Sequence, residues 1–126
     1  MVKKMTNNIN NKIRFLKVKK KAEKYGFPII GVTEAVIEKF RDDVKDNSDK
    51  SDIEIIKKIN RDLYSGQQIY KNNNIINVAY GYLHISYDRK LNIINNINNK
   101  YRSKKCGRIN QEIKAELNKI YEIEED

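Results

Sequence analysis

The stretch from Ser51 to Asp88 constrains the fold most, because it places a clear helix signal directly before a clear strand signal. Ser51 and Glu54 have the spacing of a capping box, in which the two side chains pair with backbone N–H groups that a helix start leaves free. Gly66 follows where a left-handed residue commonly ends a helix. We therefore predict a helix over residues 51–65. Its apolar stripe consists of Ile55, Ile56, Ile59 and Leu63.

After Gly66 the composition changes to Ile, Val, Tyr and Asn, and residues 72–74 are three consecutive asparagines. Such a composition favours short strands joined by a turn, so we predict a β-hairpin near residues 68–87. The apolar residues also recur at near-helical spacing over 74–105, which keeps an all-α bundle with one long helix there as the alternative. Gly81 argues against that helix, because glycine costs a helix interior about 1 kcal/mol relative to alanine.

The rest of the chain is predicted to be helical, apart from one extended piece. The remaining elements are a helix from Asn7 or Asn8 to Tyr25, a short extended segment after Pro28, a helix that Thr33 caps and that ends near Asp46, and two C-terminal helices over 89–104 and from Arg108 onward. The chain length fits a single domain over residues 1–126. The predicted fold class is α+β, mainly helical with one short hairpin.

Positive charge is gathered in blocks along the chain. The net charge is +9, residues 1–24 carry nine Lys or Arg against Glu23 alone, and residues 64–110 are basic again. Such blocks attract polyanions, either nucleic acid or an anionic membrane surface. Lys, Asn, Ile and Tyr also have AT-rich codons, so codon usage is a competing explanation for the lysines.

The first helix is predicted to have one apolar side and one basic side. Its first apolar stripe is Phe15, Val18, Ala22 and Tyr25, a second stripe begins with Ile9, Ile13 and Leu16, and the cations opposite the first stripe are Arg14, Lys17, Lys20, Lys21 and Lys24. We expect the apolar side to pack and the cations to face outward. Exposed lysines that bind nothing are common on helices, and this is the plain alternative.

No pattern in the sequence indicates catalytic or metal chemistry. His84 and Cys106 are the single histidine and the single cysteine, whereas a structural zinc site needs about four such ligands. The aspartates between residues 42 and 52 lack the spacing of a calcium loop. We therefore predict a protein that is not an enzyme, with no cofactor, no metal and no small-molecule substrate.

The sequence also predicts a cytoplasmic protein. One cysteine cannot form a disulfide within the chain, and no apolar run follows the first lysines as a secretory signal would require. No run approaches the roughly 20 apolar residues of a membrane span, so we expect no membrane partner.

The predicted order of helix, extended piece, helix, helix and hairpin resembles that of winged helix-turn-helix domains, with two further helices added. The resemblance implies a DNA-binding protein, such as a transcriptional regulator or a plasmid- or virus-maintenance factor. It also implies that the third helix enters the major groove of duplex DNA and that the hairpin lies against the phosphate backbone.

On this resemblance, Arg61 is the candidate for a base contact, because a guanidinium can bind a guanine edge through two hydrogen bonds. The expected nucleic-acid-binding residues are Lys17, Lys20, Lys21 and Lys24 on the first helix, Lys57, Lys58 and Arg61 on the third, Lys71 on the hairpin turn, and a second patch of Lys100, Arg102, Lys104, Lys105 and Arg108.

Three further expectations concern partners. The two C-terminal amphipathic helices could pair with a second copy of the chain, so a homodimer is one prediction. A helical protein-interaction module or inhibitor, whose lysines only keep it soluble, is the rival function. RNA binding by base stacking on Tyr80 and Tyr82 is a third interpretation, and it requires strand geometry there.

Overall fold

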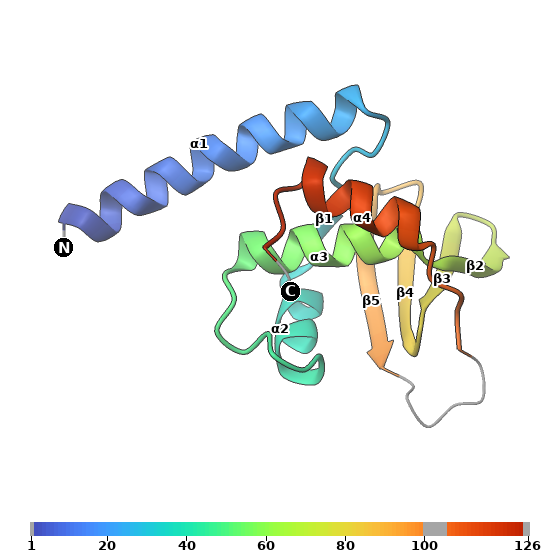
Figure 1. The fold of residues 1–126 in the computed structure, drawn as a ribbon. Helices are drawn as coiled ribbons and strands as arrows, with labels where there is room; N and C mark the ends of the chain where they lie inside the picture. The colour runs from blue at the N-terminus through green and yellow to red at the C-terminus, as the bar shows by residue number, and fades with distance from the viewer. Residues whose placement is uncertain (1, 100–105, 125–126) are drawn as a thin grey trace.

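The computed structural model describes the backbone of residues 2–99 and 106–124, with side chains from residue 10 onward. Four helices and one five-stranded sheet form this part of the chain (Figure 1). In chain order the elements are α1 (Val2–Lys24), β1 (Gly31–Val32), α2 (Glu34–Asp43), α3 (Asp52–Ser65), β2 (Gln67–Asn72), β3 (Ile75–Tyr80), β4 (Leu83–Asp88), β5 (Ile93–Asn99) and α4 (Gln111–Ile120). The α+β class is confirmed.

The strands follow the order β1-β5-β4-β3-β2, with β1 parallel to β5 and the other neighbours antiparallel. The predicted hairpin is therefore present, but it belongs to a larger sheet. The predictions of a mainly helical fold and of an all-α bundle are wrong, and so is the predicted helix over 89–104, since residues 93–99 form β5. Residues 100–105 lie outside the described residues.

The two predicted helix caps are confirmed. The Thr33 hydroxyl accepts a hydrogen bond from the Val36 N–H at 3.3 Å, and the Ser51 hydroxyl accepts one from the Glu54 N–H at 3.3 Å. Gly66 ends α3 as predicted, but with φ −80° instead of a left-handed conformation. It needs to be glycine because a Cβ there would lie 2.6 Å from a methyl group of Val78.

Two apolar clusters hold the layers together. The larger one joins α2 and α3 to one face of the sheet and includes Phe40, Ile59 and Ile85. The smaller one joins α1 to α4 and the chain after it, and includes Val18 and Tyr121. In Figure 1, α4 lies over α3, and α1 crosses above it while its first turns extend away from the rest of the molecule.

Candidate functional site

Helix α3 lies between the sheet on one side and α4 on the other, which buries the cations that were expected to read DNA. The exposed fractions of Lys57, Lys58 and Arg61 are 6%, 5% and 4%. The nucleic-acid-binding residues expected on this helix are therefore buried, whereas a helix that enters the major groove would expose them. The physical cause is packing from two directions. Helix α4 and the chain after it contact Arg61 and Lys57, and Asn47 in the loop before α3 contacts Lys58.

Each of these cations is held by polar groups inside the protein. The Lys57 ammonium donates to a Glu54 carboxylate oxygen at 2.7 Å and to the backbone carbonyl of Glu122 at 3.2 Å. The Lys58 ammonium donates to the side-chain oxygen of Asn47 at 2.7 Å. Because burying an unpaired charge is costly, these contacts indicate that both lysines serve the fold.

Arg61 is bound even more closely. Its guanidinium contacts the Asp62 carboxylate at 2.9 and 3.0 Å and the side-chain oxygen of Asn118 on α4 at 3.1 Å. Asp62 itself is 2% exposed, so the ion pair is buried on both sides. A guanidinium engaged in this way is not available to a guanine edge, and Arg61 is better described as the link between α3 and α4.

Asn60 is a fully buried residue of α3 that the sequence analysis missed. Its side-chain amide accepts from the Ile30 N–H at 2.7 Å and donates to the Ile30 carbonyl at 2.9 Å, so it satisfies both backbone groups of the residue before β1. Ile56 and Asn60 are four residues apart on one side of the helix. The signal in the sequence that could have predicted the structural role of Asn60 is its position as a polar residue within the apolar stripe of this helix.

Tyr80 faces the helices at the end of β3. The guanidinium carbon of Arg61 lies 5.9 Å from its ring centre and the Lys114 ammonium lies 5.6 Å from it. Burial raises the pKa of the Tyr80 hydroxyl. The strand geometry that RNA stacking requires is present at Tyr80, but its ring is already occupied by protein cations. Tyr82 is 46% exposed but lies in the turn between β3 and β4, so it lacks that geometry.

Helix α1 is the element on which exposed cations gather. Lys17, Lys20 and Lys24 are exposed, and spacings of three and four residues align them along one side. Val18 and Ala22 are 2% and 0% exposed and face the body. The predicted outward position of these three lysines is confirmed, while their contact with nucleic acid stays a prediction.

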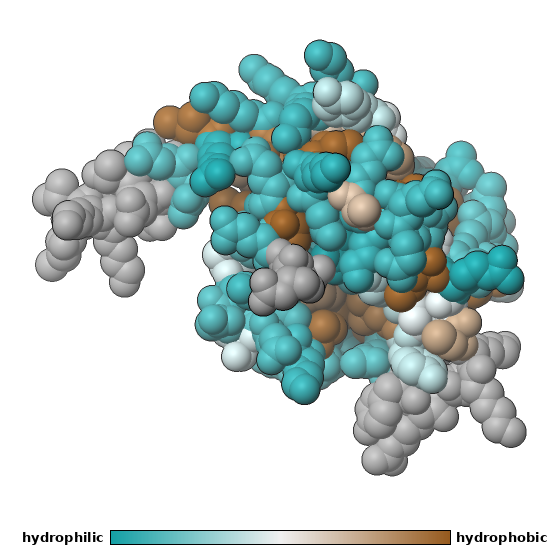
Figure 2. All heavy atoms as spheres, viewed as in Figure 1, coloured by the Kyte–Doolittle hydropathy of each residue, from teal (hydrophilic) through white to brown (hydrophobic). Residues whose placement is uncertain are grey.

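The predicted stripes of α1 are only partly buried. Tyr25 is 54% exposed, so its predicted place in the packed stripe is wrong; the helix ends at Lys24 and Gly26, with φ +85°, turns the chain away. Ile13 and Leu16 are 48% and 58% exposed. Figure 2 shows α1 as mainly hydrophilic, with hydrophobic surface beside the grey atoms.

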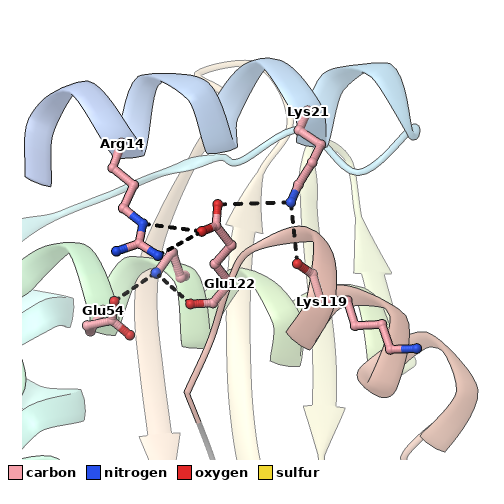
Figure 3. Close-up of polar contacts among 6 residues, drawn as sticks. Arg14, Lys21, Glu54, Lys119 and Glu122 are labelled. Atoms are coloured by element: carbon pink, nitrogen blue, oxygen red, sulfur yellow. Dashed lines mark hydrogen bonds and ion pairs between the residues drawn. The ribbon is translucent and has the colours of Figure 1, made fainter.

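Glu122, just after α4, ties α1 to the body (Figure 3). Its carboxylate contacts the Arg14 guanidinium at 3.2 Å and the Lys21 ammonium at 4.0 Å. Lys21 also donates to the Lys119 carbonyl at 3.4 Å. Lys21 is therefore half-buried and partnered, whereas Lys17, Lys20 and Lys24 are exposed. Local sequence pattern does not reveal the role of Glu122, because its partners lie about a hundred positions away along the chain.

A groove of about 660 Å³ opens between α1 and the start of α3. Phe15 and Ile53 supply apolar walls, and charges of both signs line the rest, Lys12 and Asp52 among them. Because cations and carboxylates alternate around it, this groove does not present a single sign of charge to a ligand.

The predicted sites on the remaining segments lie apart from α1. Lys71 is exposed near the turn between β2 and β3. Arg89 and Lys90, which were not among the predicted sites, are exposed in the turn between β4 and β5. Arg108 is exposed near the start of β2, where its backbone N–H donates to the Gln67 side chain at 3.0 Å. The other four predicted cations, Lys100, Arg102, Lys104 and Lys105, lie outside the described residues.

Comparison with known proteins gives no family. No protein-family model, no curated protein and no solved structure matches this chain. Within residues 2–99 and 106–124, no helix is both long enough and apolar enough to cross a membrane. The same part of the chain contains no group of three or more His, Cys, Asp or Glu side chains that could hold a metal ion.

Proposed function

We propose that this protein is a small, non-enzymatic, cytoplasmic nucleic-acid-binding protein that holds the phosphates of a DNA duplex with the exposed lysines of α1. The observation that carries the proposal is the row of Lys17, Lys20 and Lys24, which is exposed on a helix that extends from the body. Among residues 10–24, Glu23 is the single acid. A duplex attracts such a surface because binding releases its condensed counterions.

The dimensions of the row support this choice of partner. At about 1.5 Å per residue, Lys17 and Lys24 are separated by about 10 Å along the helix axis. A B-DNA strand carries one phosphate per about 3.4 Å of axis, so the row extends over about three phosphates of one strand. Contacts of this kind fix position without reading sequence. Base reading by α3 is not part of the proposal, since its cations are buried.

The salt dependence of duplex DNA binding tests the proposal. Replacing Lys17, Lys20 and Lys24 by glutamine removes three phosphate contacts, each of which contributes about 0.9 to the slope of log affinity against log salt. The slope of the variant is expected to be lower by about 2.7, measured by fluorescence anisotropy at several salt concentrations. An affinity that does not depend on salt in the unchanged protein would contradict the proposal.

The exposed apolar side chains on α1 favour a second candidate, a helical protein-interaction module. Ile13 and Leu16 lie three residues apart and are about half exposed, as anchors of a helix that docks on a protein partner would be. Replacing both by glutamine separates the candidates. A protein partner retained from nuclease-treated lysate would be lost on that change, whereas duplex DNA binding would keep its salt slope.

A further inference from the structure

The sheet has one face that the helices cover and one that they do not. Residues that pair directly across neighbouring strands have side chains on the same face. Val78, Ile85 and Ile97 pair in a row across β3, β4 and β5, and they belong to the cluster with α2 and α3. The neighbouring row therefore points to the opposite face, which we call the open face. It consists of Tyr70, Asn77, Ser86 and Asn96.

None of the four described helices packs on the open face, because α4 lies over α3 and α1 lies over α4. Gly107 covers one end of this face, since a Cβ there would meet the backbone of Ala79. Tyr70, in contrast, is 60% exposed and Asn96 is exposed. The row is thus exposed at its two ends, and Asn77 and Ser86 between them are half-buried.

The chemistry of this row is polar and uncharged. It combines one aromatic ring, two carboxamides and two hydroxyls, those of Tyr70 and Ser86, and the Ser86 hydroxyl donates to the Asn77 side-chain oxygen at 2.7 Å. Carboxamides and hydroxyls both donate and accept hydrogen bonds, as base edges and the ribose 2′-hydroxyl do. An exposed tyrosine offers a surface for stacking an unpaired base.

One end of the open face is bordered by cations. Arg89 and Lys90 are exposed there, and the Arg89 N–H donates to the Asn74 carbonyl at 2.8 Å, which brings the β2–β3 and β4–β5 turns together. Asp88 is the acid of this end, and its carboxylate accepts from the Leu91 N–H within its own turn. The end therefore has an excess of positive charge, which is complementary to phosphates.

We propose that the open face binds single-stranded RNA. An unpaired base stacks on Tyr70, Ser86 and Asn96 bond to base edges and 2′-hydroxyls, and the cations at the turns hold the phosphates that follow. This inference goes beyond the duplex contacts proposed for α1, because the layers of α3 and α4 separate the two surfaces.

The first test measures the affinity of the full chain for a short oligouridylate. Tyr70→Ala is expected to weaken binding by about tenfold, within the range of one base-stacking contact. Tyr25→Ala is the matched control, because Tyr25 is similarly exposed at 54% but lies beyond α1. Equal affinities of the two variants would overturn the proposal. Asn96→Ala, also an exposed position, is expected to weaken the same complex severalfold.

A second measurement reports stacking directly and needs no loss of structure. The chain has no tryptophan, so Tyr70→Trp introduces one fluorophore on the open face. Its emission is expected to be quenched as oligouridylate is added, because stacked bases quench indole. Unchanged emission at saturating RNA would place the RNA elsewhere and contradict the proposal.

Two further arms separate this inference from the proposed function of α1. Tyr70→Ala is expected to leave duplex DNA binding unchanged. Replacing Lys17, Lys20 and Lys24 by glutamine is expected to weaken the duplex complex, but not to change how strongly oligouridylate quenches the fluorescence of the Tyr70→Trp variant. A deoxyoligonucleotide of matching sequence lacks the 2′-hydroxyl and is expected to bind severalfold more weakly than the RNA. Equal affinity for both would overturn the assignment to RNA.

Discussion

Helices α1 and α3 both carry cations at helical spacing, yet the structure uses them in opposite ways. On α3, Lys57, Lys58 and Arg61 are at most 6% exposed and bind groups of the protein itself. On α1, Lys17 and Lys20 are exposed. The difference lies in the number of layers that pack on each helix, because α3 is covered on two sides and α1 on one. A charge pattern alone therefore does not separate a binding surface from a structural network.

The largest effect is expected when the buried ion pair of α3 is broken. Arg61→Met removes the guanidinium that contacts the buried Asp62 carboxylate, which is expected to lower the free energy of unfolding by about 3–5 kcal/mol. Urea denaturation measures the change. Arg14→Met on α1 is the control, and because the Arg14 side chain is 69% exposed we expect a loss below about 1 kcal/mol. Similar losses for both variants would remove the contrast between the helices.

A smaller effect is expected at Lys58. Lys58→Met deprives the buried Asn47 side-chain oxygen of the ammonium that donates to it, at a cost of about 1–3 kcal/mol. Lys45→Met, at an exposed position in the loop before α3, is the matched control and is expected to change stability by less than about 0.5 kcal/mol. If the Lys58→Met variant is as stable as the unchanged protein, the contact between Lys58 and Asn47 does not hold the loop before α3 in place.

The sequence predicted the features that depend on near neighbours. Thr33 and Ser51 cap the helices that follow them, and Gly66 ends α3, because each of these signals involves residues within one helical turn. The exposed lysines of α1 were likewise predictable from the apolar residues between them. Each of these predictions needed only the local periodicity of the chain.

Strand β5 was misread for a physical reason. The register of β4 and β5 shifts between Ser86 and Tyr87, where Asn95 is an extra residue of β5 that has no partner in the pairing. Ile94 and Ile97 therefore both face the helices although they are three residues apart. A spacing of three is also what a helix produces, so the irregularity gave the strand a helical pattern.

The burial of the α3 cations could not be predicted from local pattern. Lys57 contacts the carbonyl of Glu122, and Arg61 contacts Asn118, so one partner of each cation lies more than fifty positions further along the chain. The pattern indicates which side of α3 is apolar, but not that α4 covers another side. Only the tertiary arrangement of the helices decides whether the cations of α3 are buried.

The smallest effect on stability is expected at the contact between α1 and the body. Glu122→Gln removes the carboxylate that pairs with Arg14 and Lys21, and because these groups are partly exposed the loss should be about 0.5 kcal/mol. The loss should also shrink at high salt, which screens exposed charges. Urea midpoints at low and high salt check this, and a loss comparable to that of Arg61→Met would mean that Glu122 belongs to the buried network.

The most direct measurement compares two double variants of equal charge for duplex DNA binding over a range of salt concentrations. Lys20 and Lys24 on α1 are replaced by glutamine in one, and the exposed Lys45 and Lys119 in the other. We expect the slope of log affinity against log salt to fall by about 1.8 in the first, which is about 0.9 for each lost phosphate contact, and to stay unchanged in the second. Equal slopes in the two variants would contradict a binding surface on α1.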